Sequence, residues 1–84
     1  MTDPVTLNFL LELFREPHYK KAIKAYKKAI KINPRLAEAH EYLGEAYAEL
    51  GKFDLAENEL LIFKSLGSEE AYELEAFIEK MKAG

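Results

Sequence analysis

The sequence predicts an all-α fold in which about five short helices pack as antiparallel hairpins. Helix-forming residues (Ala, Leu, Glu and Lys) are plentiful, and no segment alternates apolar and polar residues as a half-buried strand does. The apolar positions also overlay themselves when the chain is shifted by 34 residues, which is typical of a helical repeat. With 84 residues and no cysteine, the chain forms one small domain, 1–84, that relies on helix stacking for its stability.

Prolines mark predicted helix boundaries in the first half of the chain. Asp3-Pro4 supplies an N-cap and a proline in the first helical turn, so a first helix begins there and is expected to end near Glu16. Pro17 removes a backbone donor and is predicted to break the helix. A second helix then covers about 19–32.

The later boundaries follow from one further proline signal and two glycines. Asn33-Pro34 repeats the cap-and-proline signal, Gly51 and Gly67 are helix stops, and Ser68 is an N-cap. The remaining helices are therefore expected at about 34–50, 53–66 and 69–82.

The 34-residue shift matches residue types position by position. It pairs Phe9 with Leu43, Leu13 with Tyr47, Tyr19 with Phe53, Ala22 with Ala56, Tyr26 with Leu60, Ile32 with Leu66, Pro17 with Gly51, and Phe77 with Leu43. Two copies and the first helix of a third are thus present, and stacking neighbours bury the apolar faces of such units.

The segment 37–60 resembles a tetratricopeptide repeat (TPR). It carries that family's Leu43-Gly44 pair, Tyr47, Gly51, Phe53 and Ala56. Residues 19–34 resemble the second helix of a preceding repeat, with Tyr19, Ala22, Tyr26, Ala29 and Pro34. The sequence departs from the family pattern at three positions, where His40 replaces Trp, Phe63 replaces a small Ala and Leu10 replaces Gly.

The resemblance implies a short right-handed TPR solenoid. Repeat one spans 3–36 with a degenerate first helix, repeat two spans 37–68, and a capping helix covers 69–82. It also implies a protein-interaction or assembly module rather than an enzyme. No apolar run reaches the roughly 18 residues of a membrane span, and the first residues lack the features of a secretory signal. A cytoplasmic location is the default expectation.

A stripe of carboxylates follows one face of the helix expected at 34–50. At helical spacing, Glu38, Glu41, Glu45 and Glu49 lie within about 80° of arc, with Tyr42 beside them. The resemblance implies that this face lines the concave binding groove, to which the last helix adds Tyr72, Glu75 and Glu79. We expect the groove to bind a cationic or amphipathic peptide or partner helix, although a solvated helix face gives the same pattern.

Charge narrows the choice of partner. The net charge is −3, but residues 1–36 carry a balance of +5 and residues 37–84 a balance of −8. Six lysines (20, 21, 24, 27, 28 and 31) share one face of the helix at 19–32. No Arg or aromatic residue lies among them, so a solubilising face is favoured over nucleic-acid or membrane binding. The resemblance also disfavours chaperone-tail binding, because chaperone-binding TPR proteins hold a peptide's terminal carboxylate with a clamp of Lys, Asn and Arg. The matching positions in this chain hold no cation and are Leu7, Leu11, Glu41, Tyr42 and Glu45.

The first helix is more apolar than a terminal helix should be. Val5, Phe9 and Leu13 suffice for a hairpin, yet Leu7, Leu11 and Phe14 form a second apolar stripe. Exposed stripes of this kind mark interfaces. The alternative function is self-association as a homodimer or larger homo-oligomer, in the manner of an engineered minimal repeat protein. The other reading is that these three residues line the N-terminal end of the groove.

The sequence contains no group of residues that suggests catalysis or a bound cofactor. His18 and His40 lack the carboxylates needed for a metal site, and Ser65 and Ser68 lack a neighbouring base. No phosphate-binding loop is present. We therefore expect no catalytic residue, no metal and no cofactor.

Overall fold

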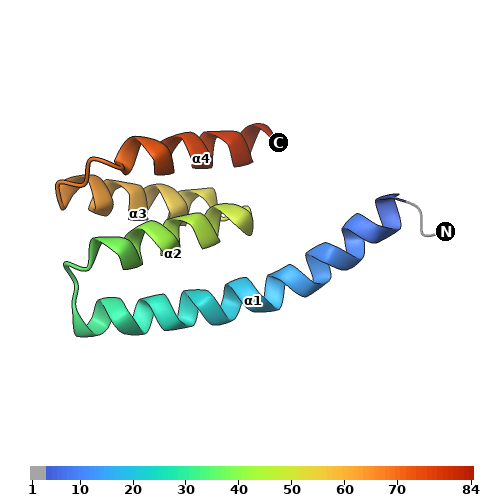
Figure 1. Ribbon diagram of the computed structural model, residues 1–84, viewed down its shortest axis with the longest axis horizontal. Coiled ribbons are helices and arrows are strands. Elements are labelled where there is room, and N and C mark those ends of the chain that lie inside the picture. The colour runs from blue at the N-terminus through green and yellow to red at the C-terminus, as the bar shows by residue number, and fades with distance from the viewer. Residues whose placement is uncertain (1–3) are drawn as a thin grey trace.

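The protein is a bundle of four helices, which the computed structural model describes along the backbone from Pro4 to Gly84 and with side chains from His18 onward (Figure 1). The helices are α1 (Pro4–Ile32), α2 (Ala37–Glu49), α3 (Phe53–Ser65) and α4 (Ala71–Ala83). Consecutive helices run antiparallel, and the described residues contain no strand. The all-α helical-repeat prediction is confirmed, with four helices in place of about five.

The predicted break at Pro17 is wrong, because α1 continues through it for 29 residues. The reason lies in the backbone angle that each position of the repeat allows. Gly51 occupies the matching position of the next repeat with φ +74°, a left-handed conformation that turns the chain back. Proline is fixed near φ −65°, which fits a helix and cannot form that turn. The first hairpin therefore does not form, and the helix bends part-way along its length instead (Figure 1).

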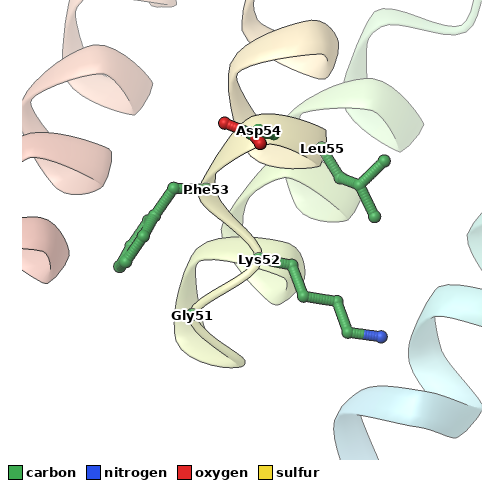
Figure 2. Close-up of a pocket in the computed structure, with 5 residues that line it drawn as sticks. All are labelled: Gly51, Lys52, Phe53, Asp54 and Leu55. Carbon is green, nitrogen blue, oxygen red and sulfur yellow. The ribbon is translucent and has the colours of Figure 1, made fainter.

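The turn between α2 and α3 is a Schellman motif centred on Gly51. The amide of Lys52 donates to the carbonyl of Tyr47 at 2.8 Å, and the amide of Gly51 donates to that of Ala48 at 3.0 Å. After the turn, Phe53 points to the side of α4, whereas Lys52 and Leu55 point to the side of α1 (Figure 2). The predicted glycine stop is confirmed, and Gly67 repeats it with φ +79° after α3.

Two predicted helix starts shift along the chain. The side-chain oxygen of Asn33 accepts from the amide of Arg35 at 3.2 Å, which forms a local turn and delays α2 to Ala37. Ser68 accepts from the amide of Glu70 at 3.2 Å, and α4 begins just after it, at Ala71. Both polar residues satisfy a backbone donor before the helix, as their short side chains favour.

The core lies where α2, α3 and α4 meet. Its largest fully buried side chains are Leu43, Phe63, Leu74 and Ile78. Phe63, which stands where the TPR pattern has Ala, is only 2% exposed and so belongs to this core. The C-terminal half of α1 adds Ile23, with Tyr19, Tyr26 and Ile30 packed at the edge.

Gly44 allows α4 to approach α2 closely. A Cβ atom at this position would lie 3.1 Å from Cδ2 of Leu74 and 3.5 Å from Cβ of Glu59. The sequence suggests that Gly44 brings the two helices of one hairpin together. In the structure, Gly44 of α2 faces both neighbouring helices, because Glu59 belongs to α3 and Leu74 belongs to α4.

His40 ties three segments together and is buried, with 4% of its surface exposed. Its Nε2 donates to the carbonyl of Pro34 at 2.9 Å, in the loop before α2. Its Nδ1 lies 2.6 Å from Oε2 of Glu59 on α3. The two contacts place both ring nitrogens against oxygen atoms, so His40 joins the loop before α2 to α3. The sequence pattern identified the packing position without revealing its carboxylate partner.

Replacing Gly44 by Val should lower the free energy of unfolding by about 2 kcal/mol, because the added side chain overpacks the contact with Leu74. Ala76→Val is the matched control, since Ala76 is exposed on α4 and loses only about 0.5 kcal/mol of helix propensity. Urea unfolding followed by circular dichroism measures both variants. Equal losses would contradict the close-approach role of Gly44.

Candidate functional site

The exposed face of α2 forms the floor of a groove between α1 and α4. Within the part of the chain that the structure describes, α1 and α4 each pack on α2, and no Cα atom of α1 lies within 8 Å of one of α4. Two neighbouring hollows open on this face, and we call them together the α2 groove.

The first, the aromatic hollow, has a volume of about 260 Å³ and combines residues of three helices. They are Tyr19, Ala22 and Tyr26 of α1, Tyr42, Glu45, Ala46 and Glu49 of α2, and Phe77 of α4. The ring centroids of Tyr26 and Tyr42 lie 5.8 Å apart at an interplanar angle of 32°, which joins α1 to α2 at the rim. Tyr42 remains 43% exposed, so one ring is available to a ligand.

The second, the acidic hollow, has a volume of about 370 Å³ and lies at the N-terminal end of α2. It is lined by Ala37, Glu38, Glu41, Phe63, Ser68, Glu69 and Glu70. Four of these seven residues are carboxylates, which come from α2 and from the loop before α4.

The carboxylates of the groove repel one another. Burial raises the pKa of Glu41, and the charges of Glu45, Glu70, Glu73 and Glu38 raise it further. None of Glu38, Glu41, Glu45 and Glu49 forms an ion pair with a described cation.

The pKa values of Glu45 and Tyr42 are raised as well, in part by neighbouring carboxylates. Burial, followed by the charge of Glu49, raises the pKa of Glu45. The pKa of the Tyr42 phenol is raised mainly by Glu41, then by Glu38. The floor of the groove is therefore an uncompensated anionic surface.

The structure brings together only part of the predicted set. Glu38, Glu41, Tyr42, Glu45 and Glu49 share the groove as the sequence predicts. The carboxylates that reach Glu41 from the α4 side are Glu70 and Glu73, which the sequence analysis did not select.

The residues predicted to extend the groove along α4 lie elsewhere. Glu75 pairs with Lys64 of α3 at 3.0 Å. Glu75 and Glu79 line a different hollow, on the α3 side, together with Leu61. Tyr72 is 68% exposed, and its hydroxyl donates to Glu73 at 3.3 Å. The side chains of Leu7, Leu11 and Phe14 lie outside the described residues.

Aromatic residues of the groove were missed because the repeat pattern assigns them to the core. Phe77 matches Leu43 under the 34-residue shift, and Leu43 is 2% exposed beneath α3 and α4. Phe77 is instead partly exposed and lines the aromatic hollow.

The lysine face of α1 is exposed at all six positions. Lys27 places its Nζ 5.9 Å from the ring centroid of Tyr47, a cation–π contact that packs its stem on α2. A second ion pair on the described surface joins Lys82 to Glu57. Exposed pairs of this kind add little to stability.

The described residues hold no group of three or more His, Asp or Glu side chains placed to bind a metal ion. Among the same residues, none of the helices combines the length and apolarity needed to cross a bilayer.

Comparison with known families decides the class of protein. The family model described as TPR repeat matches residues 13–51, which cover about the last two thirds of α1 and all of α2. The match and the four helices support a TPR-type repeat protein. TPR repeats are protein-interaction units, so the match supports a generic protein–protein interaction module. Searches of the curated proteins and of the solved structures each found no significant match.

Removing a partly buried charge from the α2 groove should stabilise the fold. A raised pKa means that Glu41 and Glu45 bind protons more readily when folded, so their ionisation costs stability above that pKa. Glu41→Gln should therefore raise the free energy of unfolding at pH 7 by less than about 1 kcal/mol, given solvent screening. The gain should be smaller at a second, more acidic pH, because the raised pKa lets the parent carboxyl take up its proton more readily than in the unfolded chain.

Urea unfolding at both pH values tests this expectation. Glu79→Gln is the control, since Glu79 lies on the α3 side, away from the carboxylates of the groove. A gain that is independent of pH, or equal in the control, would show that mutual repulsion in the groove does not limit stability.

Proposed function

We propose that the α2 groove binds a cationic or amphipathic segment of another protein. The observation that carries the proposal is the run of unpaired carboxylates along α2, flanked by aromatic side chains of α1 and α4. A partner with basic residues would relieve the repulsion that raises the pKa of Glu41 and Glu45. Its apolar side chains would cover the rings of Tyr42 and Phe77.

The same charges argue against a peptide whose terminal carboxylate is the main anchor. At Glu41, Tyr42 and Glu45 the groove offers acidic and phenolic groups where such a peptide needs a cation. Like charges across an interface cost affinity and suppress wrong partners. The groove therefore selects by charge as well as by shape.

A synthetic basic amphipathic peptide of Lys, Leu and Ala is expected to bind the parent protein, whereas its Glu-for-Lys counterpart is not. Glu41→Lys/Glu45→Lys should weaken this binding about tenfold or more at low salt, because it places cations against the peptide. Fluorescence anisotropy with labelled peptide measures the affinities.

The matched control for that experiment is Glu75→Lys/Glu79→Lys, which makes the same change of net charge on the α3 side. It should leave most of the affinity in place. Equal weakening by both double variants would show attraction to overall charge and would overturn binding in the groove.

The position of the N-terminal part of α1 favours self-association as a second candidate function. The N-terminal part of α1 extends beyond the ends of the other three helices (Figure 1). Seven of the residues over 4–16 are Val, Leu or Phe. An apolar helical segment that does not fold back on the bundle is a candidate interface with a second copy of the chain.

Light scattering after size exclusion, at low salt and at about 0.5 M salt, tests self-association. We expect the parent chain to form a dimer or larger oligomer that Leu7→Ser/Leu11→Ser dissolves, because burial of these side chains would drive assembly. Leu55→Ser/Leu61→Ser, on exposed leucines of α3, should leave the mass unchanged. A monomeric parent in every condition would rule out this candidate.

A further inference from the structure

We infer that the aromatic hollow is a site for a single arginine side chain of the bound segment. The inference rests on the proposed function and deepens it, because it assigns one chemical group to one part of the α2 groove. Its basis is the convergence of three tyrosines and one phenylalanine with two carboxylates on one hollow.

The rings provide the first half of the site. Tyr19 and Tyr26 come from α1, Tyr42 from α2 and Phe77 from α4, so the hollow has aromatic side chains on its floor and both walls. A cation placed over an aromatic face is attracted by the negative face of the π system, and this attraction grows when the cation is partly removed from water. The tilt of 32° between Tyr26 and Tyr42 gives the hollow rings in more than one orientation.

The carboxylates provide the second half. Glu45 and Glu49 lie one turn apart on α2 and line the same hollow. Neither forms an ion pair with a described cation. A guanidinium group carries five N–H donors in a planar fork, which can meet carboxylate oxygens at its edge while its face lies on a ring.

Arginine fits this combination better than lysine. The guanidinium is more weakly hydrated and stacks on aromatic faces, whereas the ammonium of lysine is a strongly hydrated point charge. The volume of the hollow, about 260 Å³, is below the range of roughly 300–1,000 Å³ that is typical of pockets for whole small molecules. The hollow therefore suits one side chain rather than a cofactor.

The direct test is a titration of the parent protein, followed by nuclear magnetic resonance, with the capped amino acid N-acetyl-arginine-N-methylamide. Capped lysine and capped citrulline, the neutral analogue of arginine, are the comparison probes. We expect shifts of the ring protons of Tyr26, Tyr42 and Phe77 with arginine, about fivefold weaker binding of lysine, and no saturable binding of citrulline.

Two variants separate the rings from the charges. Tyr42→Leu keeps an apolar side chain and removes a half-exposed ring, so it should abolish the preference for arginine over lysine. Tyr72→Leu is its control, on an exposed ring of α4 that is absent from the lining of the hollow. Glu45→Gln should weaken arginine binding, with Glu79→Gln as its control, and circular dichroism checks that each variant is folded.

The outcomes distinguish this inference from the proposed function. Equal affinity for arginine and lysine, or a preference that survives Tyr42→Leu, overturns the arginine site even if the Lys, Leu and Ala peptide still binds the groove. Arginine binding that Tyr42→Leu and Glu45→Gln both reduce supports the site. If the basic peptide fails to bind while capped arginine binds at the hollow, the wider groove proposal fails and the arginine site stands.

Discussion

The close packing of α2 against its neighbours is the constraint on which the rest of this structure depends. Every other helix contacts α2, and Gly44 lets Leu74 of α4 approach to a distance that a Cβ atom would obstruct. His40 adds a polar link from the same helix to α3 and to the preceding loop. Because α2 is held on these sides, its remaining face, which carries the carboxylates, becomes the floor of the groove.

The sequence predicted the parts of the fold in which local chemistry and packing agree. Gly51 and Gly67 stop helices because only glycine adopts their positive φ without strain. At Pro17 local rules conflict. Proline disfavours the helix interior, yet its fixed φ also forbids the turn that Gly51 makes, and the helix continues. A repeat pattern aligns these two positions without showing that their backbone angles are incompatible.

Spacing within one helix fixes which residues of α2 share a face, whereas the residues that α4 adds depend on how several helices meet. Helical spacing places Glu38, Glu41, Glu45 and Glu49 on one face, and the structure keeps them there. The contribution of α4 depends on the rotation of that helix about its axis, which Leu74 and Ile78 set by their burial. That rotation turns Glu75 towards Lys64, and spacing alone does not specify it.

The continuous α1 links the width of the aromatic hollow to the packing of one long helix. Within the described residues, the backbone of α1 packs on α2, and α1 contributes Ile23 to the core. Tilting α1 about its contact with α2 would therefore move Tyr19 and Tyr26 relative to Phe77 and would displace Ile23 as well. The part of α1 that extends past the bundle belongs to the same helix (Figure 1). A partner bound to that part would thus be coupled both to the spacing of the aromatic rings and to the core.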